Sequence, residues 1–283
     1  MGKRRCNTFF AIFQPNKERI LILSNSDLAS NIALNSLLPT LSTNHDVHLW
    51  LSAKVGKAGA RPRQLESLKF FEQDLFNQLF SPLLNESKNT ERYKSFEGLN
   101  VFLQSTVREE NKINSPEAIG RLHELSPDLI VSIRFGGILR TEAISIPKLG
   151  VINLHSGKLP KYKGVMATFW ALKNGESEIG TTLHTIDDPS IDTGKIIKIS
   201  TYKVDKSKSY LWHVLALYTQ GTLDVLEAIN SLKEGREIKA IPQKTSETYF
   251  TFPNQEECDE FEAEGFKFMD EREYIDLIQV HYL

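Results

Sequence analysis

The chain is poor in cysteine and has no long hydrophobic run. Its two cysteines, Cys6 and Cys258, stand near opposite ends of 283 residues, which excludes a disulfide scaffold and fits a reducing compartment. No stretch approaches the roughly 18 apolar residues of a membrane span. The short apolar run that ends at Phe13 is broken by Gln14 and Pro15 too early for a secretory signal. We therefore expect a cytoplasmic protein that does not enter a membrane.

A surplus of positive charge is missing too. The chain has 34 Lys and Arg against 36 Asp and Glu, a formal net charge of -2, whereas dedicated nucleic-acid binders are usually basic. Nucleic acid is therefore not expected as a partner. The apolar content of 40% and the charged content of 25% are those of an ordinary globular protein. The length suits one large domain, or a main domain with a small appendage.

Buried strands alternate with amphipathic helices along most of the chain. The apolar pattern predicts strands at residues 19–24, 47–51, 99–103, 127–133, 150–154, 180–186 and 195–204. Helices are predicted at about 27–38, ended by Pro39, at 63–84, ended or bent by Pro82, from Ser115 onward, and at 209–234. This alternation predicts an α/β fold, a doubly wound and mostly parallel sheet.

The composition changes after about residue 240. Tyr249, Phe250 and Phe252 crowd together, and an acidic stretch follows at 255–264, which favours an extended arm and then a short helix. We expect residues 1–240 to form the main domain and residues 241–283 a C-terminal arm or small subdomain. Because aromatic side chains favour interfaces, this segment suggests a homodimer. The alternative is that the aromatic side chains pack back onto the main domain.

Three polar residues carry the chemistry of the strongest motif. Asn153 and His155 finish an apolar strand and lie two residues apart, so both side chains point to one side of the sheet. Asp192 lies in a later loop, where its carboxylate can orient the imidazole. An amide and an imidazole can stabilise a developing oxyanion while a carboxylate helps to move protons. These are the predicted catalytic residues, and no metal is expected.

The motif has further landmarks in a fixed order, namely Asn153-Leu-His155, Leu159-Pro160, Gly164, residues 180–184 and Asp192-Thr-Gly194. The segment from about 128 to 204 resembles the 10-formyltetrahydrofolate-dependent formyltransferases. Where that family usually has Pro and then Ser after the histidine, this chain has Ser156 and Gly157, which makes the loop more flexible. The resemblance implies an enzyme that uses 10-formyltetrahydrofolate as the formyl donor.

Ligands of doubly wound sheets bind beyond the carboxyl ends of the strands. The resemblance implies that the pterin lies there, between the loop after residue 133 and the loop before Asp192. The predicted folate-binding residues are Arg134, Phe135, Gly136, Gly137, Ile138 and Leu139 in the first loop, and Asp187 and Asp188 in the second. The alternatives are that the apolar members belong to the core and that the two aspartates form a solvated turn.

The acceptor is predicted to be the amine of a small molecule. Lys158, Lys161, Lys163 and Gly164 stand beside the motif, and three lysines would attract an anionic group such as the phosphates of a nucleotide sugar. The resemblance implies a nucleotide-linked amino sugar or an amino acid such as hydroxyornithine. A solvated lysine loop is the alternative.

Three other functions stay open. They are hydrolysis of formyltetrahydrofolate, formylation of methionyl-tRNA, and a catalytically silent folate-binding module. The tRNA enzymes add a barrel-like C-terminal domain, whereas about 80 residues follow the motif here.

His184 and His213 are assigned structural roles, because single histidines within a strand or helix are more often structural. His45 and His48 lack the further spaced ligands of a metal site.

Overall fold

The computed structural model describes residues 17–53, 61–86, 92–236, 238–244 and 248–283. Cys6 and the apolar run before Gln14 lie outside these described residues. Cys258 is a buried free thiol. Within the described ranges, no helix combines the length and the apolar character needed to cross a bilayer.

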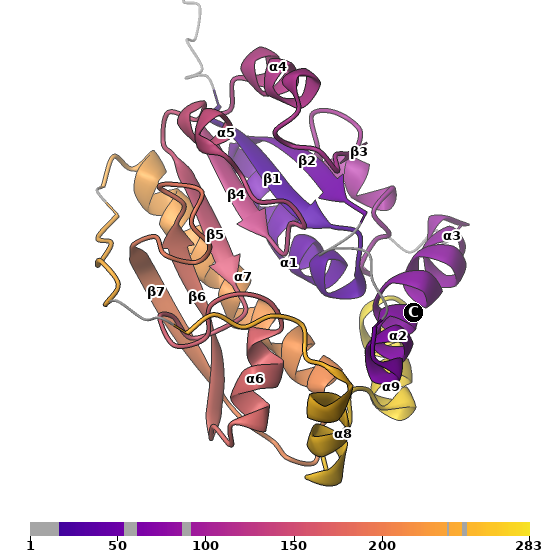
Figure 1. Ribbon diagram of the computed structural model, residues 1–283. Helices are drawn as coiled ribbons and strands as arrows, with labels where there is room; N and C mark the ends of the chain where they lie inside the picture. The colour runs from indigo at the N-terminus through magenta and orange to yellow at the C-terminus, as the bar shows by residue number, and fades with distance from the viewer. Residues whose placement is uncertain (1–16, 54–60, 87–91, 237, 245–247) are drawn as a thin grey trace, which may run out of the picture.

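One sheet organises the chain (Figure 1). Its strands are β1 (Arg19–Asn25), β2 (Asp46–Ser52), β3 (Arg108–Glu109), β4 (Leu129–Ile133), β5 (Val151–His155), β6 (Glu178–Thr185) and β7 (Ile196–Lys203). They are ordered β3-β2-β1-β4-β5-β6-β7. The first five strands in this order, from β3 to β5, pair in parallel with their neighbours. Strand β6 pairs antiparallel with both β5 and β7. The predicted fold class, an α/β fold with a mostly parallel sheet, is confirmed.

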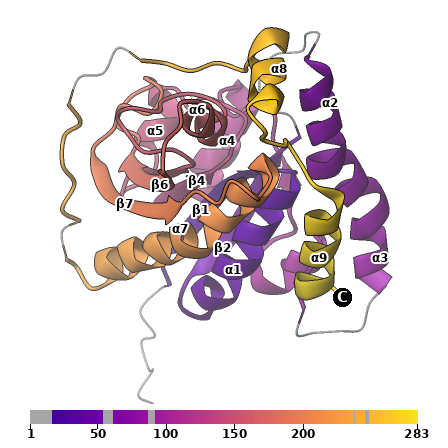
Figure 2. The same cartoon turned by 90° about the horizontal axis from the view of Figure 1, so that it is seen from below.

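Helices cover both faces of the sheet. They are α1 (Leu28–Asn44), α2 (Arg63–Lys69), α3 (Ser81–Glu86), α4 (Pro116–Leu125), α5 (Thr141–Ser145), α6 (Ala167–Lys173), α7 (Tyr210–Lys233), α8 (Gln255–Ala263) and α9 (Glu271–His281). Helices α1 and α7 lie on one face, and α4 and α5 on the other (Figure 2). Strand β1 shows why: Ile20 and Ile22 join the core shared with α1 and α7, while Leu21 packs with α4.

The first helix is longer than predicted. Asp27 caps it as expected by accepting a hydrogen bond from the Ser30 amide at 2.7 Å. Pro39 does not end it, because α1 continues to Asn44. Leu41, beyond the proline, is buried in the core, and this packing outweighs the one backbone hydrogen bond that proline cannot make.

The strand predicted at residues 99–103 was wrong. This stretch is a 3-10 helix, Gly98–Phe102, in which Leu99 is buried while Val101 is 71% exposed. The side chains therefore do not alternate as in a strand with one buried face. The edge of the sheet is completed by the short strand β3, which pairs with Trp50 and Leu51 of β2.

The helix predicted at residues 63–84 extends to Glu86. It runs through α2, the π-helical turns Phe70–Asp74 and Phe76–Phe80, and α3. Pro82 lies inside this continuous helical stretch and does not end it, because helical residues continue to Glu86.

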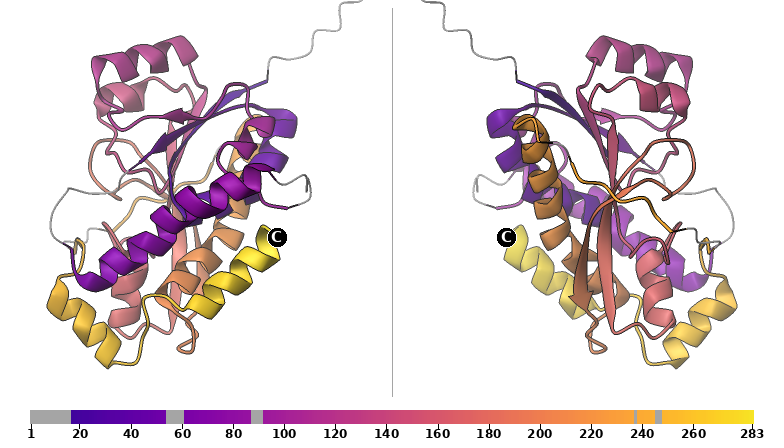
Figure 3. Two further views of the ribbon diagram at one scale, coloured as in Figure 1. Left: turned by 90° about the vertical axis from the view of Figure 1, so that its right-hand side faces the viewer. Right: turned by 90° about the vertical axis from the view of Figure 1, so that its left-hand side faces the viewer.

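The C-terminal residues fold back onto the main body. Helix α9 lies beside α2 and α3 (Figure 3), with Phe71 and Tyr274 in edge-to-face contact at 5.4 Å. Phe261 is fully buried in the same core as strand β1. The Tyr282 hydroxyl donates to Asn31 Oδ1 of α1 at 2.7 Å. The division at residue 240 stays a prediction about folding units.

The three clustered aromatic residues of the tail differ in their surroundings. Phe250 stacks on Trp170 at 5.0 Å and on Tyr162 at 5.5 Å between ring centroids. Tyr249 and Phe252 are 49% and 36% exposed. Phe250 therefore packs on its own chain, and the homodimer stays a prediction.

We expect Phe261→Ala to lower the free energy of unfolding by about 3–5 kcal/mol, the usual cost of emptying a fully buried aromatic site. Its ring contacts Phe169 and Phe266, each at 4.8 Å between centroids. Ile275→Ala in α9 is the control, because Ile275 is 54% exposed and should change stability by about 0.5 kcal/mol or less. Urea denaturation measures both. Equal effects would mean that α8 is not part of the core.

Candidate active site

Four polar side chains meet at the carboxyl edge of the sheet. The carboxylate of Asp192 lies 3.5 Å from Nδ1 of His155 through Oδ2, and 3.5 Å from Nε2 of His184 through Oδ1. Asn153 Nδ2 lies 3.1 Å from the same nitrogen of His184. The structure thus brings together the three residues predicted as catalytic and adds a fourth.

The sequence reasoning missed His184, which it assigned a structural role. The residue is the cross-strand neighbour of Asn153 in the antiparallel pairing of β5 with β6, so the two side chains share one face. Only the register of that pairing reveals the contact. His213 is the structural histidine that was expected, since its Nδ1 contacts the Ser209 carbonyl of its own helix at 2.7 Å.

Backbone carbonyls fix one proton on each histidine ring. Nδ1 of His184 lies 2.7 Å from the Thr185 carbonyl, which can only accept, so this nitrogen carries the hydrogen. Nε2 of His184 then accepts from Asn153 when the ring is neutral. Nε2 of His155 donates to the Tyr162 carbonyl at 2.7 Å. That leaves Nδ1 of His155 directed at the carboxylate of Asp192.

Asp192 is held as an anion although it is only 10% exposed. Burial raises its pKa, but the charge of His155, a hydrogen bond with His184 and the Gly164 amide together lower it to about 2. The Gly164 amide donates to Oδ2 at 2.8 Å. A carboxylate with so low a pKa is a poor proton acceptor near neutral pH and is well suited to stabilising a charged imidazole.

Two glycines of the motif are required by the close approach of neighbouring backbone. Gly164 has φ +98°, and a Cβ there would lie 2.1 Å from the Phe250 carbonyl oxygen. A Cβ on Gly194 would lie 1.7 Å from the Thr185 carbonyl oxygen. Any larger residue at either position would therefore push apart the loops that carry the site.

The loop predicted to hold folate divides its residues between core and surface. Arg134 turns into the protein, where it pairs with Asp27 at 3.1 Å and Glu72 at 3.4 Å. Phe135 and Leu139 pack on the second core cluster, and Ile138 is 55% exposed. The other two members are glycines: the Gly136 amide donates to Ser52 Oγ at 2.9 Å, and a Cβ on Gly137 would lie 2.9 Å from the Phe135 ring.

The second predicted loop lies at the surface. Asp187 accepts from Thr185 Oγ1 at 2.9 Å, and Asp188 accepts from the Ser190 amide at 2.7 Å. Both aspartates are exposed. Local hydrogen bonds therefore shape this loop, and its outer surface stays open to a ligand.

The lysines beside the motif are not equivalent. Lys161 Nζ pairs with Glu176 and lies over the Tyr162 ring, so its charge is partly neutralised. Lys158 and Lys163 are half-buried. The three side chains thus do not form one uniform cationic surface.

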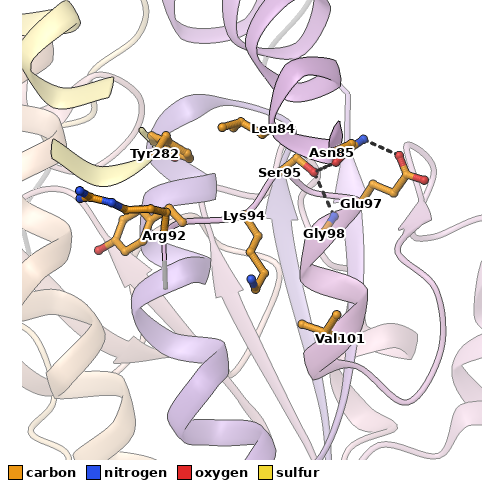
Figure 4. A pocket seen from close by; sticks show the side chains of 10 residues that line it. Leu84, Asn85, Arg92, Lys94, Ser95, Glu97, Gly98, Val101 and Tyr282 are labelled. Atoms are coloured by element: carbon orange, nitrogen blue, oxygen red, sulfur yellow. Dashed lines mark hydrogen bonds between the residues drawn. The ribbon is translucent and has the colours of Figure 1, made fainter. Parts of the chain in front are cut away.

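A cavity of about 260 Å³ lies away from these residues, between η3 (Gly98–Phe102), α3 and α9. Figure 4 shows that four of its lining residues, Asn85, Ser95, Glu97 and Gly98, are joined by hydrogen bonds. Asn85 donates to Glu97 at 2.6 Å, and the Gly98 amide donates to Ser95 at 3.0 Å. The cavity contains no residue of the candidate site.

In the described part of the chain, no three His, Cys, Asp or Glu side chains are grouped to hold a metal ion.

Residues 84–211, which include all four polar residues of the site, match the family described as formyl transferase. This segment is therefore similar to the formyl transferase family. The chain is 35% identical to the methionyl-tRNA formyltransferase of Geobacter metallireducens over 131 residues, 46% of this chain and 41% of that protein. It is 35% identical to the Clostridium novyi enzyme over 154 residues, 54% and 47%. The chain therefore spans less than half the length of these curated relatives.

Solved formyltransferase structures share the fold. An N-formyltransferase from Helicobacter canadensis, in complex with folinic acid and dTDP-3-aminofucose, has a TM-score of 0.54 at 18% identity, covering 81% of this chain and 70% of that one. Glycinamide ribonucleotide transformylase 1 from Symbiobacterium toebii has a TM-score of 0.55 at 16% identity, covering 82% and 97%. At these identities the likeness concerns the architecture.

We expect Gly164→Ala to lower the free energy of unfolding by about 1–3 kcal/mol, because it forces strained backbone and a clash with Phe250. The matched control is Gly120→Ala, within α4, where a Cβ meets nothing within 4 Å. That change should instead raise stability by about 0.5–1 kcal/mol. Denaturant titration of both variants measures the contrast. The same sign for both would contradict the packing of Gly164.

The acid dependence of stability should reveal Asp192. Its folded pKa of about 2 lies below the ordinary value of 3.8, so its contribution is complete above about pH 4 and is lost as pH falls through 2. The shift corresponds to about 2 kcal/mol. The difference in unfolding free energy between wild type and Asp192→Asn should shrink by that amount from pH 5 to pH 2. A difference independent of pH would show that Asp192 is not held as described.

Proposed function

We propose that the protein transfers a formyl group from 10-formyltetrahydrofolate to the amine of a small acceptor. The observation that carries this proposal is the cluster of Asn153, His155, His184 and Asp192 at the carboxyl edge of the sheet, within the formyl transferase segment. Such edges are where ligands of doubly wound sheets bind.

Asn153 is proposed to stabilise the oxyanion. When the amine attacks the formyl carbon, the carbonyl π electrons move onto oxygen. The side-chain amide has two N–H donors, and one of them is engaged by His184, so the other is left for the charged oxygen. His155 can add a second donor by exchanging its hydrogen bond to the Tyr162 carbonyl.

A histidine is proposed to take the proton that the attacking amine must lose. Asp192, with a pKa of about 2, stays charged and stabilises the imidazolium that forms. The C–N10 bond then breaks, and N10 leaves as an amine after receiving a proton, so the proton lost by the acceptor can be returned to the donor. No net proton change is required of the enzyme.

The folate donor is proposed to lie between the loops at 134–139 and 187–192. Exposed Ile138 and half-buried Phe135 offer apolar contact to a flat ring, and Asp187 and Asp188 line the second loop. Arg134 contributes by holding its loop through the ion pair with Asp27. In this arrangement the formyl group is proposed to reach Asn153.

The acceptor is proposed to be a nucleotide-linked amino sugar, with an amino acid such as hydroxyornithine as the alternative. The supporting observations are the fold shared with sugar N-formyltransferases, one of them crystallised with dTDP-3-aminofucose, and the lysines beside the site. Lys158, Lys161 and Lys163 are the proposed phosphate contacts, and the ion pair of Lys161 with Glu176 leaves the charge of Lys161 partly neutralised. Proteins of this fold can use other acceptors, so the choice has to be tested directly.

Formylation of methionyl-tRNA is the second candidate. The observation in its favour is the 35% identity to methionyl-tRNA formyltransferases over 131 and 154 residues. Incubation of the protein with 10-formyltetrahydrofolate and each acceptor class separates the two functions. Transfer to methionyl-tRNA alone would replace the sugar proposal. Formate release without an acceptor would indicate a hydrolase, and folate binding without turnover a silent module.

We expect Asn153→Ala to lower kcat by about 10²–10³, the usual loss when one oxyanion donor is removed. The binding of folate should change little, because the lost contact forms mainly in the transition state. Asn230→Ala is the control, an exposed asparagine on α7, and it should turn over like wild type. Release of tetrahydrofolate, followed by absorbance, measures the rates. Near-wild-type turnover of Asn153→Ala would remove this residue from the mechanism.

A further inference from the structure

Gln243 lies in the extended tail that follows α7, next to the loop that carries Asp192. Its side-chain nitrogen Nε2 donates to two backbone carbonyls of that loop, Asp192 at 3.0 Å and Gly194 at 2.6 Å. One amide group therefore binds both ends of the turn Asp192-Thr-Gly194. The tail is anchored beside it by paired backbone hydrogen bonds between Ile196 and Ile241, each 2.8 Å.

The turn that Gln243 binds has a backbone conformation that needs support. Asp192 has φ +55°, a left-handed conformation that is uncommon outside glycine, although aspartate adopts it more readily than most residues. Gly194 packs against the Thr185 carbonyl on the other side. The turn is therefore held between β6 and the tail, with Gln243 supplying the side-chain contacts from the tail.

The same tail also touches the loop that binds His155. The Phe250 amide donates to the Lys163 carbonyl at 2.9 Å, and the Val165 amide donates to the Phe250 carbonyl at 3.1 Å. The Phe250 ring stacks on Tyr162, whose carbonyl accepts from His155. Both partners of the His155–Asp192 pair are thus supported by residues after 240.

We propose that Gln243 is a positioning residue that keeps the carboxylate of Asp192 at its observed distance from His155 and His184. It acts through the backbone of the turn, with no contact to the reacting atoms. The role in catalysis rests on the proposed formyl transfer, whereas the role in loop geometry does not.

The chemistry of glutamine fits this role. A neutral amide nitrogen has two hydrogens and so can serve two carbonyls at once. The amide oxygen Oε1 is buried and has no partner among the described residues, which costs free energy. The Gln243 side chain therefore satisfies two backbone carbonyls of the turn while its own oxygen makes no hydrogen bond. Such a loss of local stability is expected where the geometry of a functional site is maintained.

The first test measures loop geometry without any assay of activity. Gln243→Met keeps the length of the side chain and removes both donors. The Gly164 amide, which donates to Asp192 Oδ2 in the wild type, should exchange its hydrogen at least tenfold faster in the variant, while core amides of β1 and β4 are unchanged. Lys244→Met is the matched control, the exposed next residue of the same tail, and should leave this exchange unchanged.

The second test measures catalysis. Gln243→Met should lower kcat about tenfold and leave the KM for the formyl donor within about twofold, because positioning acts on the reacting geometry. In the Asp192→Asn background the same change should have almost no further effect, since the carboxylate that Gln243 positions is already gone. A residue that only stabilised the fold would lower activity equally in both backgrounds.

The two tests separate the two proposals. Wild-type exchange at Gly164 in a folded Gln243→Met variant overturns the positioning role, whatever the activity. Faster exchange in a protein that formylates nothing supports the loop geometry and sinks the proposed function alone. If the Met variant does not fold, Gln243→Glu tests the same point, because its carboxylate keeps the shape but has no donor for the two carbonyls.

Discussion

The buried carboxylate of Asp192 is the interaction on which the rest of the site depends. A charge that is 10% exposed is stable only if its lone pairs are bound. Here the Gly164 amide donates to it directly, and each of His155 and His184 can donate to it when its ring is protonated. Each partner comes from a different strand or loop, so satisfying one charge fixes how three segments meet. The contact of Asn153 with His184 then fixes the position of the Asn153 side chain.

The hydrogen bonds of this carboxylate also require particular backbone conformations around it. The Gly164 amide can approach the carboxylate because no side chain stands between this loop and Phe250. The Asp192 turn can adopt its left-handed conformation because β6 and the tail hold it from two sides. The C-terminal segment is thus part of the architecture of the site, although it lies some fifty residues beyond the last residue of the motif. Stability of the tail and geometry of the site are therefore linked.

The ion pairs of Arg134 also decide which side chains of the loop after β4 can contact a ligand. The sequence places Arg134 at the end of β4, where a side chain could project toward a bound molecule. Asp27 and Glu72 draw it inward instead. Burial raises the pKa of Glu72 to about 7, with Asp27 adding to the rise and Arg134 opposing it. Apolar Ile138, rather than the cation, remains at the surface.

Local patterns along the chain were enough to predict most of the helices and strands and part of the candidate site. Continuous apolar runs predicted the strands β1, β4 and β5, and the ordered motif that resembles the formyltransferases pointed to Asn153, His155 and Asp192. Tertiary structure decided what depends on distant partners. Burial of Leu41 carried α1 past Pro39, while the exposure of Val101 shows that residues 99–103 do not form a strand. Strand register made His184 a neighbour of Asn153, and the fold-back of the tail brought Gln243 to Asp192. Such contacts join residues far apart in the chain, and a local pattern contains no information about which of them will meet.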